Sequence, residues 1–255
     1  MIPYFGTPIT PETCAAVALT GAHAFVSMAD PRNIALAIEV CQSFAVDNGA
    51  FSAWRKGAPI TNWRPYFEWV GSLVRVPGFD FAVIPDVIDG DEEANDRLLA
   101  QWPWQEQRQI GAPVWHLHES IDRLQRLAMT WPRVCLGSSG EFARVGTSRW
   151  WRRMHEAFDA ICDRDGLPVC KVHGLRMLDP KVFSRFPFAS ADSTNIARNI
   201  GIDNAWRGTY PPTTKEARTA VMRARVEAEQ SPPVYDRNEA ARASQTYPLF
   251  DEAMA

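Results

Sequence analysis

Three aspartates stand at the ends of short apolar runs, where a carboxylate can act on a bound molecule. They are Asp47, Asp86 and Asp192. A lone aspartate after a strand most often caps a turn or a helix, because its oxygens accept backbone N–H groups. Three aspartates that meet on one rim instead favour a functional carboxylate cluster, which can supply both a nucleophile and a proton-transfer group.

Histidines and a glycine-serine run occupy equivalent places. His116 and His118 share one side of an apolar run by the period of two, and His173 ends another run. Each histidine has an alternative role as a hydrogen-bonded core residue. The run Gly137-Ser138-Ser139-Gly140 is either an ordinary loop or a place where backbone amides approach a flat ligand or a phosphate closely.

An arginine- and tryptophan-rich segment follows this loop. The segment ARVGTSRWWRR contains Arg144, Arg149, Arg152 and Arg153 beside two tryptophans. Cations that pair with phosphates, next to aromatic rings that stack on bases, are typical of nucleic-acid contact. The alternative is a solvated helix face whose two tryptophans turn into the core.

The elements that would position these residues alternate along the chain. Eight apolar or β-branched runs predict strands: Ile2–Phe5, His23–Met28, Ser43–Asp47, Phe81–Pro85, Pro113–His118, Val134–Gly137, Pro168–His173 and Pro187–Asp192. Stretches with helical spacing lie near residues 11–20, 31–41, 62–74, 91–102, 119–130, 147–163, 179–185 and 213–229. This alternation predicts a single-domain α/β fold, a TIM-like (β/α)8 barrel over residues 1–230. Residues 231–255 are predicted to be a tail that packs on the barrel or is partly disordered.

The sequence fits two alternative structures less well than it fits a barrel with strand-tip aspartates. An open, doubly wound sheet is disfavoured because the sequence has no GxGxxG or GxxxxGK[ST] phosphate loop. Asn48-Gly49 is a strong hairpin signal, but a hairpin there would interrupt the alternation. We therefore predict that Asp47 stands at the tip of a buried strand, beside a glycine loop.

Short sequence signals also predict helix boundaries. Thr10-Pro11, Asp30-Pro31 and Asp179-Pro180 each place a capping oxygen before a proline suited to the first helical turn. Gly21 and Gly111 are expected to end the first and fourth helices.

Composition limits the class of protein. The 255 residues are 46% hydrophobic with a net charge of −3, which suits one sizeable core and argues against a histone-like coat on nucleic acid. The N-terminus lacks a signal peptide and no run of 18 apolar residues occurs, so a cytoplasmic protein without a membrane partner is expected. The five cysteines form no CxxC pair, which predicts reduced thiols rather than a disulfide framework or a zinc knot.

Taken together, these segments resemble the tRNA-guanine transglycosylase superfamily. Asp47-Asn48-Gly49-Ala50-Phe51-Ser52 is similar to the family's Asp-Ser-Gly-Gly-Phe-Gln segment, and Val83-Ile84-Pro85-Asp86 to the strand that ends on its base-recognising aspartate. Leu136-Gly137-Ser138-Ser139-Gly140-Glu141 resembles the glycine-rich loop, and His173-Gly174 falls at a small-residue turn. Ser190-Ala191-Asp192-Ser193 resembles the tip that bears the nucleophile, and Asn195-Ile196-Ala197-Arg198 the run after it.

Departures from the family pattern point to one branch. The tRNA enzymes carry a zinc site of three cysteines and a histidine near the C-terminus, whereas no cysteine follows Cys170 here and no histidine follows His173. Together with the short length, this favours the phage and bacterial DNA 7-deazaguanine transglycosylase (DpdA) branch. The glutamine expected on the fifth strand is replaced by His116 or His118 nearby, so base selectivity is expected to differ.

The resemblance implies roles for individual residues. Asp192 would be the nucleophile, Asp47 would move protons, and Asp86 would accept hydrogen bonds from the N–H edge of a guanine-like base. The other implied base-binding residues are Phe51, His116, His118, Gly137, Ser138, Ser139, Gly140 and His173. The implied phosphate ligands are Arg144, Arg149, Arg152, Arg153 and Arg198. The scheme requires no metal and no cofactor.

The implied reaction replaces guanine in double-stranded or locally opened DNA with a 7-deazaguanine base, such as the 7-cyano or 7-aminomethyl form. The sequence leaves three alternative functions open. A tRNA-guanine transglycosylase would perform the same exchange on RNA. A metal-dependent hydrolase would use His116, His118, His173 and Asp192 as ligands. A non-catalytic barrel would bind nucleic acid or a partner through the Trp-Arg segment.

Overall fold

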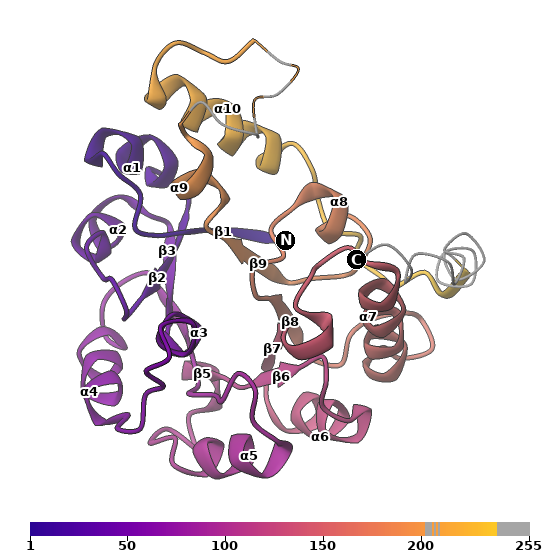
Figure 1. Ribbon diagram of the computed structural model, residues 1–255. Coiled ribbons are helices and arrows are strands. Elements are labelled where there is room, and N and C mark those ends of the chain that lie inside the picture. Colours follow the sequence, from indigo (N-terminus) through magenta and orange to yellow (C-terminus); the bar gives the residue numbers. More distant parts are fainter. Residues whose placement is uncertain (202–205, 207, 209, 239–255) are drawn as a thin grey trace.

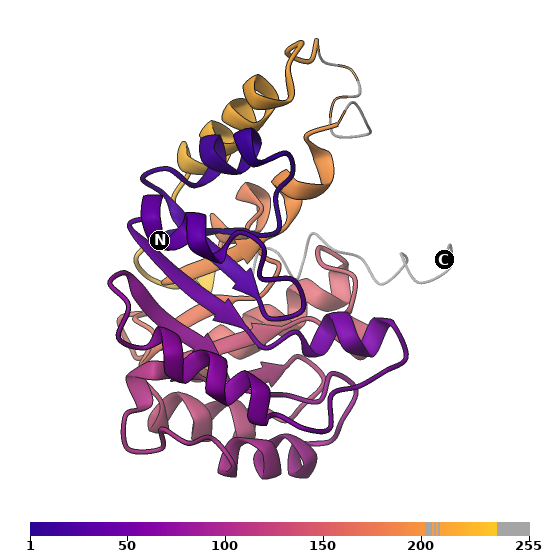
Figure 2. The ribbon, with the colours of Figure 1, turned by 90° about the vertical axis from the view of Figure 1, so that its left-hand side faces the viewer.

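The computed structural model describes residues 1–201, 206, 208 and 210–238, which form a nearly closed barrel of parallel strands surrounded by helices (Figure 1). Its nine strands are β1 (Ile2–Gly6), β2 (His23–Ser27), β3 (Ser43–Asp47), β4 (Phe79–Val83), β5 (Gly111–Ala112), β6 (Val114–His116), β7 (Arg133–Gly137), β8 (Lys171–Gly174) and β9 (Ser190–Ser193). The strands all run in one direction, as the side view in Figure 2 shows. The predicted TIM-like α/β barrel is confirmed.

A single proline explains why nine strands occupy the eight predicted positions. The sheet order begins with β5 and ends with β6, and only Pro113 separates these two short strands in the chain. Ala112 accepts the amide of Ile84 from the β4 side, and Pro113 accepts the amide of Cys135 in β7. Because proline has no N–H to donate, it divides this strand while its carbonyl still joins the ladder.

The helices alternate with the strands and form the outer ring in Figure 1. Their bounds are α1 (Glu12–Leu19), α2 (Ile34–Val40), α3 (Ala50–Arg55), α4 (Arg64–Leu73), α5 (Glu92–Ala100), α6 (Ile121–Thr130), α7 (Ser148–Ile161), α8 (Pro180–Phe183), α9 (Asn195–Asn199) and α10 (Lys215–Glu227), with 3-10 turns η1 (Arg108–Ile110) and η2 (Gly140–Phe142). All eight predicted helices occur within a few residues of their expected bounds. The sequence did not signal the short helices α3 and α9, each of which follows directly on a strand that ends in an aspartate or serine.

The boundary signals were only partly correct. Asp179 caps α8, since its side chain accepts the amide of Lys181 at 2.9 Å before Pro180 in the first turn. The expected caps at Thr10 and Asp30 are wrong, because α1 begins after Pro11 without a side-chain cap and the Asp30 carboxylate pairs with Arg32. Gly21 follows α1 with a φ of 67°, as expected for a helix end.

Gly111 does not end the predicted fourth helix, although it caps the short 3-10 turn η1. The helix α5 ends at Ala100, and Gly111 instead begins β5. A side chain at this position would approach Trp102 and Ile84 to within 3 Å, so the glycine permits close packing of a strand.

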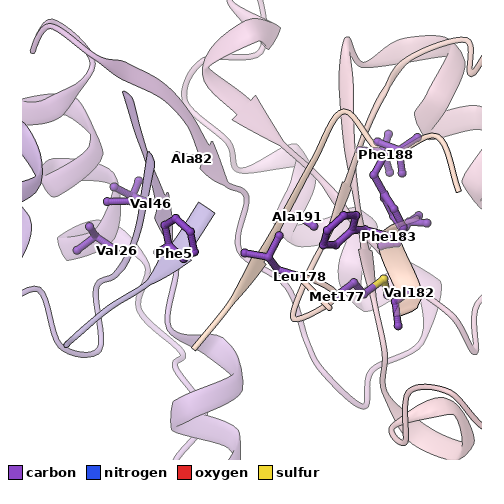
Figure 3. Packing of buried hydrophobic residues seen from close by; sticks show 14 of the residues in the cluster. Phe5, Val26, Val46, Ala82, Met177, Leu178, Val182, Phe183, Phe188 and Ala191 are labelled. Atoms are coloured by element: carbon purple, nitrogen blue, oxygen red, sulfur yellow. The ribbon is translucent and has the colours of Figure 1, made fainter. Parts of the chain in front are cut away.

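Two apolar regions hold the barrel together. The larger lies between the sheet and the helices, and Figure 3 shows part of it, with Phe5 near Val26 and Val46. The smaller fills the barrel interior and comprises Tyr4, Phe25, Ala45, Phe81, Val83, Ala112, Val114 and Cys135. Large rings (Tyr4, Phe25 and Phe81) together with smaller side chains fill the interior, which makes it a packed core rather than a pore.

The chain after β9 completes the outer ring. The helix α10 lies beside α1, and Arg223 donates to the carbonyls of Val17 and Thr20 at its end (Figure 1). Tyr235 is buried against the barrel, where its amide donates to Gly166 at 2.8 Å. Residues 231–238 therefore pack on the barrel, and the rest of the predicted tail lies outside the described residues.

Two further sequence expectations concern membrane-spanning helices and the state of the cysteines. None of the helices that the structure describes has the length and apolar character to cross a bilayer. All five cysteines are free thiols, of which Cys14 and Cys135 are buried.

Candidate active site

A cavity of about 170 Å³ lies at the C-terminal ends of the strands. Its walls include the three predicted aspartates Asp47, Asp86 and Asp192. The other predicted site residues on its walls are Phe51, His116, Gly137, Ser138, Ser139 and Arg198. The predicted convergence of strand tips on one rim is confirmed for this set, since active sites of such barrels form at this end.

Asp47 ends β3 and is held by two donors. The hydroxyl of Ser27 and the amide of Gly49 both donate to its Oδ2, at 2.7 and 3.1 Å. Gly49 turns the chain with a φ of 82°, and α3 begins at the next residue, so the strand-tip interpretation is confirmed and the hairpin is wrong. Burial, with smaller contributions from the charges of Asp192 and Asp86, raises the pKa of Asp47 to about 6.

Asp86 lies in a polar clamp. Its Oδ1 accepts from the side-chain amide of Asn48 at 2.8 Å, and its Oδ2 lies 2.9 Å from Nε2 of His116. Asn48 is itself fixed, because it also donates to the carbonyl of Ile84 and accepts the amide of Ala50. This clamp fixes the plane of the carboxylate at the cavity wall. Asn48 belongs to the motif Asp47-Asn48-Gly49-Ala50-Phe51-Ser52, but the sequence predicted no role for its side chain.

Asp192 ends β9 and is 4% exposed. The amide of Arg176 donates to its Oδ1 at 2.9 Å, and Nε2 of His173 lies 3.4 Å from the same oxygen. His173 is fully buried, its Nδ1 bonds the Ser190 hydroxyl, and burial lowers its pKa despite the nearby carboxylate. His173 therefore lies beneath Asp192 as a neutral ring and does not line the cavity.

Arg176 is a functional candidate that the sequence analysis missed. It has a φ of 60°, a conformation uncommon for a residue other than glycine. Its backbone amide points to Asp192, while its guanidinium donates to the Ser138 carbonyl at 2.6 Å and lies 3.9 Å from the ring centre of Phe51. Backbone strain of this kind is concentrated at functional sites. Its place two residues after His173-Gly174 was the only available signal.

The glycine-serine run forms the wall opposite Asp47, and His118 lies behind it. Ser139 bonds Nδ1 of both His116 and His118, while Nε2 of His118 bonds the Gly90 carbonyl. Ser138 accepts the indole N–H of Trp150, and Gly140 adopts a φ of 55° beside His118. His118 is thus one layer away from the cavity that it was predicted to line.

A wider cleft of about 1290 Å³ continues from the cavity toward solvent. Its cationic lining residues are Arg55, Arg176, Lys181, Arg185 and Arg198, against two carboxylates, Asp89 and Asp179. Only Arg198 of these cations was predicted, because Arg55 and the three cations between residues 176 and 185 do not form a dense run like the arginine-rich segment. The two spaces share Phe51 and Arg176 on their common wall.

The arginine-rich segment contributes Ala143, Val145, Gly146 and Trp151 to this cleft, but none of its arginines. Arg144 and Arg152 are exposed, and Arg149 pairs with Glu141. Arg153 donates to the carbonyls of Leu117 and Glu119 and pairs with Glu156, which gives it a structural role.

The two tryptophans of this segment face the core. Trp150 is fully buried, and Trp151 lines the outer cleft but is only 7% exposed and stacks on Phe186, so neither ring is open to bases as the nucleic-acid interpretation required. For these rings the alternative interpretation, a helix face with its tryptophans turned inward, is the one the structure supports.

The ligand set of the hydrolase alternative is not assembled. His118 and His173 each use both ring nitrogens in contacts within the protein. Within the described part of the chain, no three histidine, cysteine, aspartate or glutamate side chains are grouped to hold a metal ion.

Comparison with known proteins gave no relative for this chain. No family model, no curated protein and no solved structure matches it. The geometry of the site therefore carries the functional inference by itself.

Proposed function

We propose that this protein exchanges a guanine base in DNA for a 7-deazaguanine derivative through a covalent intermediate on Asp192. The observation that carries the proposal is the meeting of Asp47, Asp86 and Asp192 on one cavity of about 170 Å³. Base exchange with retention at the sugar needs a nucleophile, a proton-transfer group and an acceptor that recognises the base. Three carboxylates around one cavity can divide these roles.

Asp192 is the group best placed to attack the sugar. The Arg176 amide and the His173 ring both contact its Oδ1, so we assign Oδ2 as the nucleophile. In the first step Oδ2 bonds to the anomeric carbon while the bond from that carbon to the base nitrogen breaks, leaving its electron pair on the base. In the second step the incoming base nitrogen bonds to the same carbon and the ester bond to Asp192 breaks. Two inversions give net retention.

Asp47 is suited to the proton transfers that accompany these steps. Its pKa of about 6 lies close to neutral pH, so both its acid and base forms are accessible. The acid form gives a proton to the departing base, and the resulting carboxylate takes the N–H proton of the incoming base. Protons and electrons balance over the cycle without another reactant.

Asp86 is suited to hold the base edge. A carboxylate offers about four lone-pair directions, and Asn48 and His116 occupy one on each oxygen. The remaining directions can accept two adjacent N–H groups, such as those on one edge of guanine.

The sizes of the two spaces support a polymeric substrate. The inner cavity is smaller than the roughly 300–1,000 Å³ typical of small-molecule pockets, so it suits one ring system rather than a nucleotide. The outer cleft carries five cations that can pair with a phosphodiester backbone. A target nucleotide must leave its stack to reach the cavity, and phosphate contacts offset that cost.

The test is to incubate the protein with guanine-containing DNA and the 7-cyano or 7-aminomethyl base, digest the DNA, and analyse the nucleosides by mass spectrometry. We expect a 7-deazaguanine nucleoside with wild-type protein and none with Asp192→Asn. A transfer RNA substrate is run in parallel. Modification of the RNA alone would refute DNA as the substrate, and modification of neither would refute base exchange.

A further inference from the structure

Behind Asp86 lies an unbroken chain of polar groups. Nε2 of His118 bonds the Gly90 carbonyl at 3.1 Å, and Nδ1 of His118 bonds the Ser139 hydroxyl at 3.0 Å. The same hydroxyl bonds Nδ1 of His116 at 3.1 Å, and Nε2 of His116 lies 2.9 Å from the Asp86 carboxylate. The two imidazole rings are stacked, with centres 5.5 Å apart. The chain thus runs from a backbone carbonyl to the cavity wall.

The donors and acceptors of this chain can be counted. A carbonyl only accepts, so His118 must carry a proton on Nε2. The Ser139 hydroxyl has a single proton and can donate to only one of its two histidine partners. The other histidine must therefore donate its own Nδ1 proton to the Ser139 oxygen.

Both possible assignments require one additional proton. If His118 is the second donor, it carries protons on both nitrogens and is a cation. If His116 is the second donor, its Nε2 is unprotonated and lies 2.9 Å from the Asp86 carboxylate unless a further proton is present. Such an approach of two electron-rich atoms is unfavourable in a buried site, where His116 is 2% exposed and Asp86 is 8% exposed.

Two features favour placing this proton on a histidine rather than on Asp86. Asn48 donates to Asp86, and hydrogen bonds to a carboxylate stabilise its charged form. The contact between Nε2 and Oδ2 also lies off the axis of the ring N–H, as in an ion pair rather than an aligned hydrogen bond.

Charged groups around the chain are of both signs. Glu119, which accepts the backbone amide of His116, is neutralised by Arg123. Across the cavity, Asp47 and Asp192 add negative charge and Arg176 and Arg198 add positive charge, so that with Asp86 three carboxylates face two guanidinium groups. The surplus of carboxylates on the cavity side favours a cation on the histidine chain.

We propose that His118 and Ser139 are positioning residues that retain one proton on this chain, so that one histidine is a cation and Asp86 faces the cavity as an ionised, acceptor-only carboxylate. The consequence for specificity rests on the proposed function: a bound base must present two adjacent N–H donors to Asp86. Guanine presents them, whereas hypoxanthine lacks the exocyclic amine and adenine presents a ring acceptor.

The protonation of each ring nitrogen of His116 and His118 can be measured by NMR of wild-type protein labelled with ¹⁵N in its histidine rings. At pH 7.5 an ordinary histidine is about nine-tenths neutral, given a reference pKa of about 6.5. We expect one of the rings of His116 and His118 to show both nitrogens protonated at this pH. His116→Gln and His118→Gln assign the signals. Two singly protonated rings in the wild type would overturn the proposal.

Variants test the positioning role. Asp86→Asn and Ser139→Ala should each reduce the doubly protonated fraction severalfold at pH 7.5, because each removes one member of the chain. The matched control is Ser43→Ala, which removes a serine–histidine hydrogen bond of 2.8 Å to His23 at the other end of the barrel. It should alter the His23 signals and leave the other pair unchanged. An unaltered His116 and His118 pattern in Ser139→Ala would refute the role of Ser139.

Binding separates this inference from the proposed function. Calorimetry should show wild-type protein preferring guanine over hypoxanthine, and Ser139→Ala should reduce that preference roughly tenfold, the effect of losing one charge-assisted hydrogen bond. If guanine fails to bind while the histidine signals are as expected, the proposed function is refuted and the retained proton stands. If guanine binds but both rings are neutral, the retained proton is refuted and the proposed function stands.

Discussion

Both ends of the barrel contain buried or half-buried carboxylates, but their surroundings shift the pKa values of Asp80 and Asp47 in opposite directions. At the N-terminal end, Asp80 pairs with Arg133 at 2.9 Å and accepts the Tyr4 hydroxyl at 2.5 Å. Burial by itself would raise the pKa of Asp80, but the Arg133 charge and these hydrogen bonds outweigh it, and the pKa is lowered. At the C-terminal end, Asp47 has no comparable cation, and burial raises its pKa to about 6.

The difference separates a structural carboxylate from a chemical one. Arg133 also lies over the Phe81 ring at 4.0 Å, so the pair at the N-terminal end is built into the barrel interior and closes it. At the other end, Asp47, Asp86 and Asp192 are held mainly by neutral donors and a histidine, and they keep their charge available to a bound molecule. A protein retains such an unfavourable cluster where function requires it.

The largest effect on the C-terminal end is expected from Asp192→Asn. An amide is nearly isosteric but far less nucleophilic, so base exchange should fall by about four to six orders of magnitude. The folded structure and DNA affinity should remain near those of the wild type. Wild-type protein with DNA and no incoming base should give a covalent protein–DNA adduct on denaturing gels, and the variant should give none.

If Asp192→Asn forms the adduct as well as wild-type protein does, Asp192 is not the nucleophile, and Asp47 or Asp86 takes that role. The matched variant at the N-terminal end is Asp80→Asn, which should retain the adduct whenever the protein is folded. This control separates loss of the nucleophile from general damage to the barrel.

Asp47→Asn should have a smaller effect on activity. Proton transfer by a positioned side chain typically contributes about 10²–10⁴-fold, so the variant should still form the adduct slowly. Rapid-quench measurement of adduct formation tests this. If Asp47→Asn forms the adduct as fast as wild-type protein does, Asp47 does not transfer the proton in this step.

Asp80→Asn should lower the free energy of unfolding, whereas Asp47→Asn at the other end should raise it. Removing one partner of a buried ion pair costs about 3–5 kcal/mol, and because the Asp80 side chain is 26% exposed we expect about 2–3 kcal/mol. The lowered pKa means that Asp80 stabilises the fold at neutral pH and loses this effect as the pH falls. In urea denaturation, the deficit should therefore be largest near pH 7 and shrink below about pH 4.

Asp47→Asn should instead stabilise the protein. Because the pKa is raised to about 6 in the folded state, ionisation of Asp47 destabilises the fold progressively as the pH rises from about 4 to 6, and fully above that. The gain should reach at most about 3 kcal/mol above pH 6 and vanish near pH 4. Both donors to Asp47 reach the same oxygen, so an asparagine oxygen can replace it. A loss of stability at pH 7 would contradict the contrast between the two ends.

The contrast also shows what could be predicted from the sequence. The barrel and its aspartates were predictable because apolar runs define strands and parallel strands bring their C-terminal ends to one rim. The burial of Trp150 and Trp151 had a signal too, since with Met154, Phe158 and Ile161 they follow the helical period.

The conformation of Arg176 and the partners of His118 could not be predicted. A left-handed arginine has no sequence signature, and the bond from His118 to Gly90 joins loops distant in the chain. Four of the five cations of the outer cleft were also missed, because no dense run marks them, whereas the arginine-rich segment was overvalued.

The smallest expected effect tests the outer cleft. Arg55 and Arg198 line it from α3 and α9, whereas Arg144 and Arg152 are exposed outside its lining. Each phosphate contact releases close to one counterion, so Arg55→Ala with Arg198→Ala should reduce the salt slope of DNA binding by about 2 and weaken affinity severalfold across sequences. Arg144→Ala with Arg152→Ala removes the same charge from the protein and controls for net charge. Titrations at several salt concentrations should show a smaller change for this second pair. Equal changes would mean that DNA follows the face of α7 as well, and a change confined to the second pair would show that the cleft beside the carboxylates is not where the backbone lies.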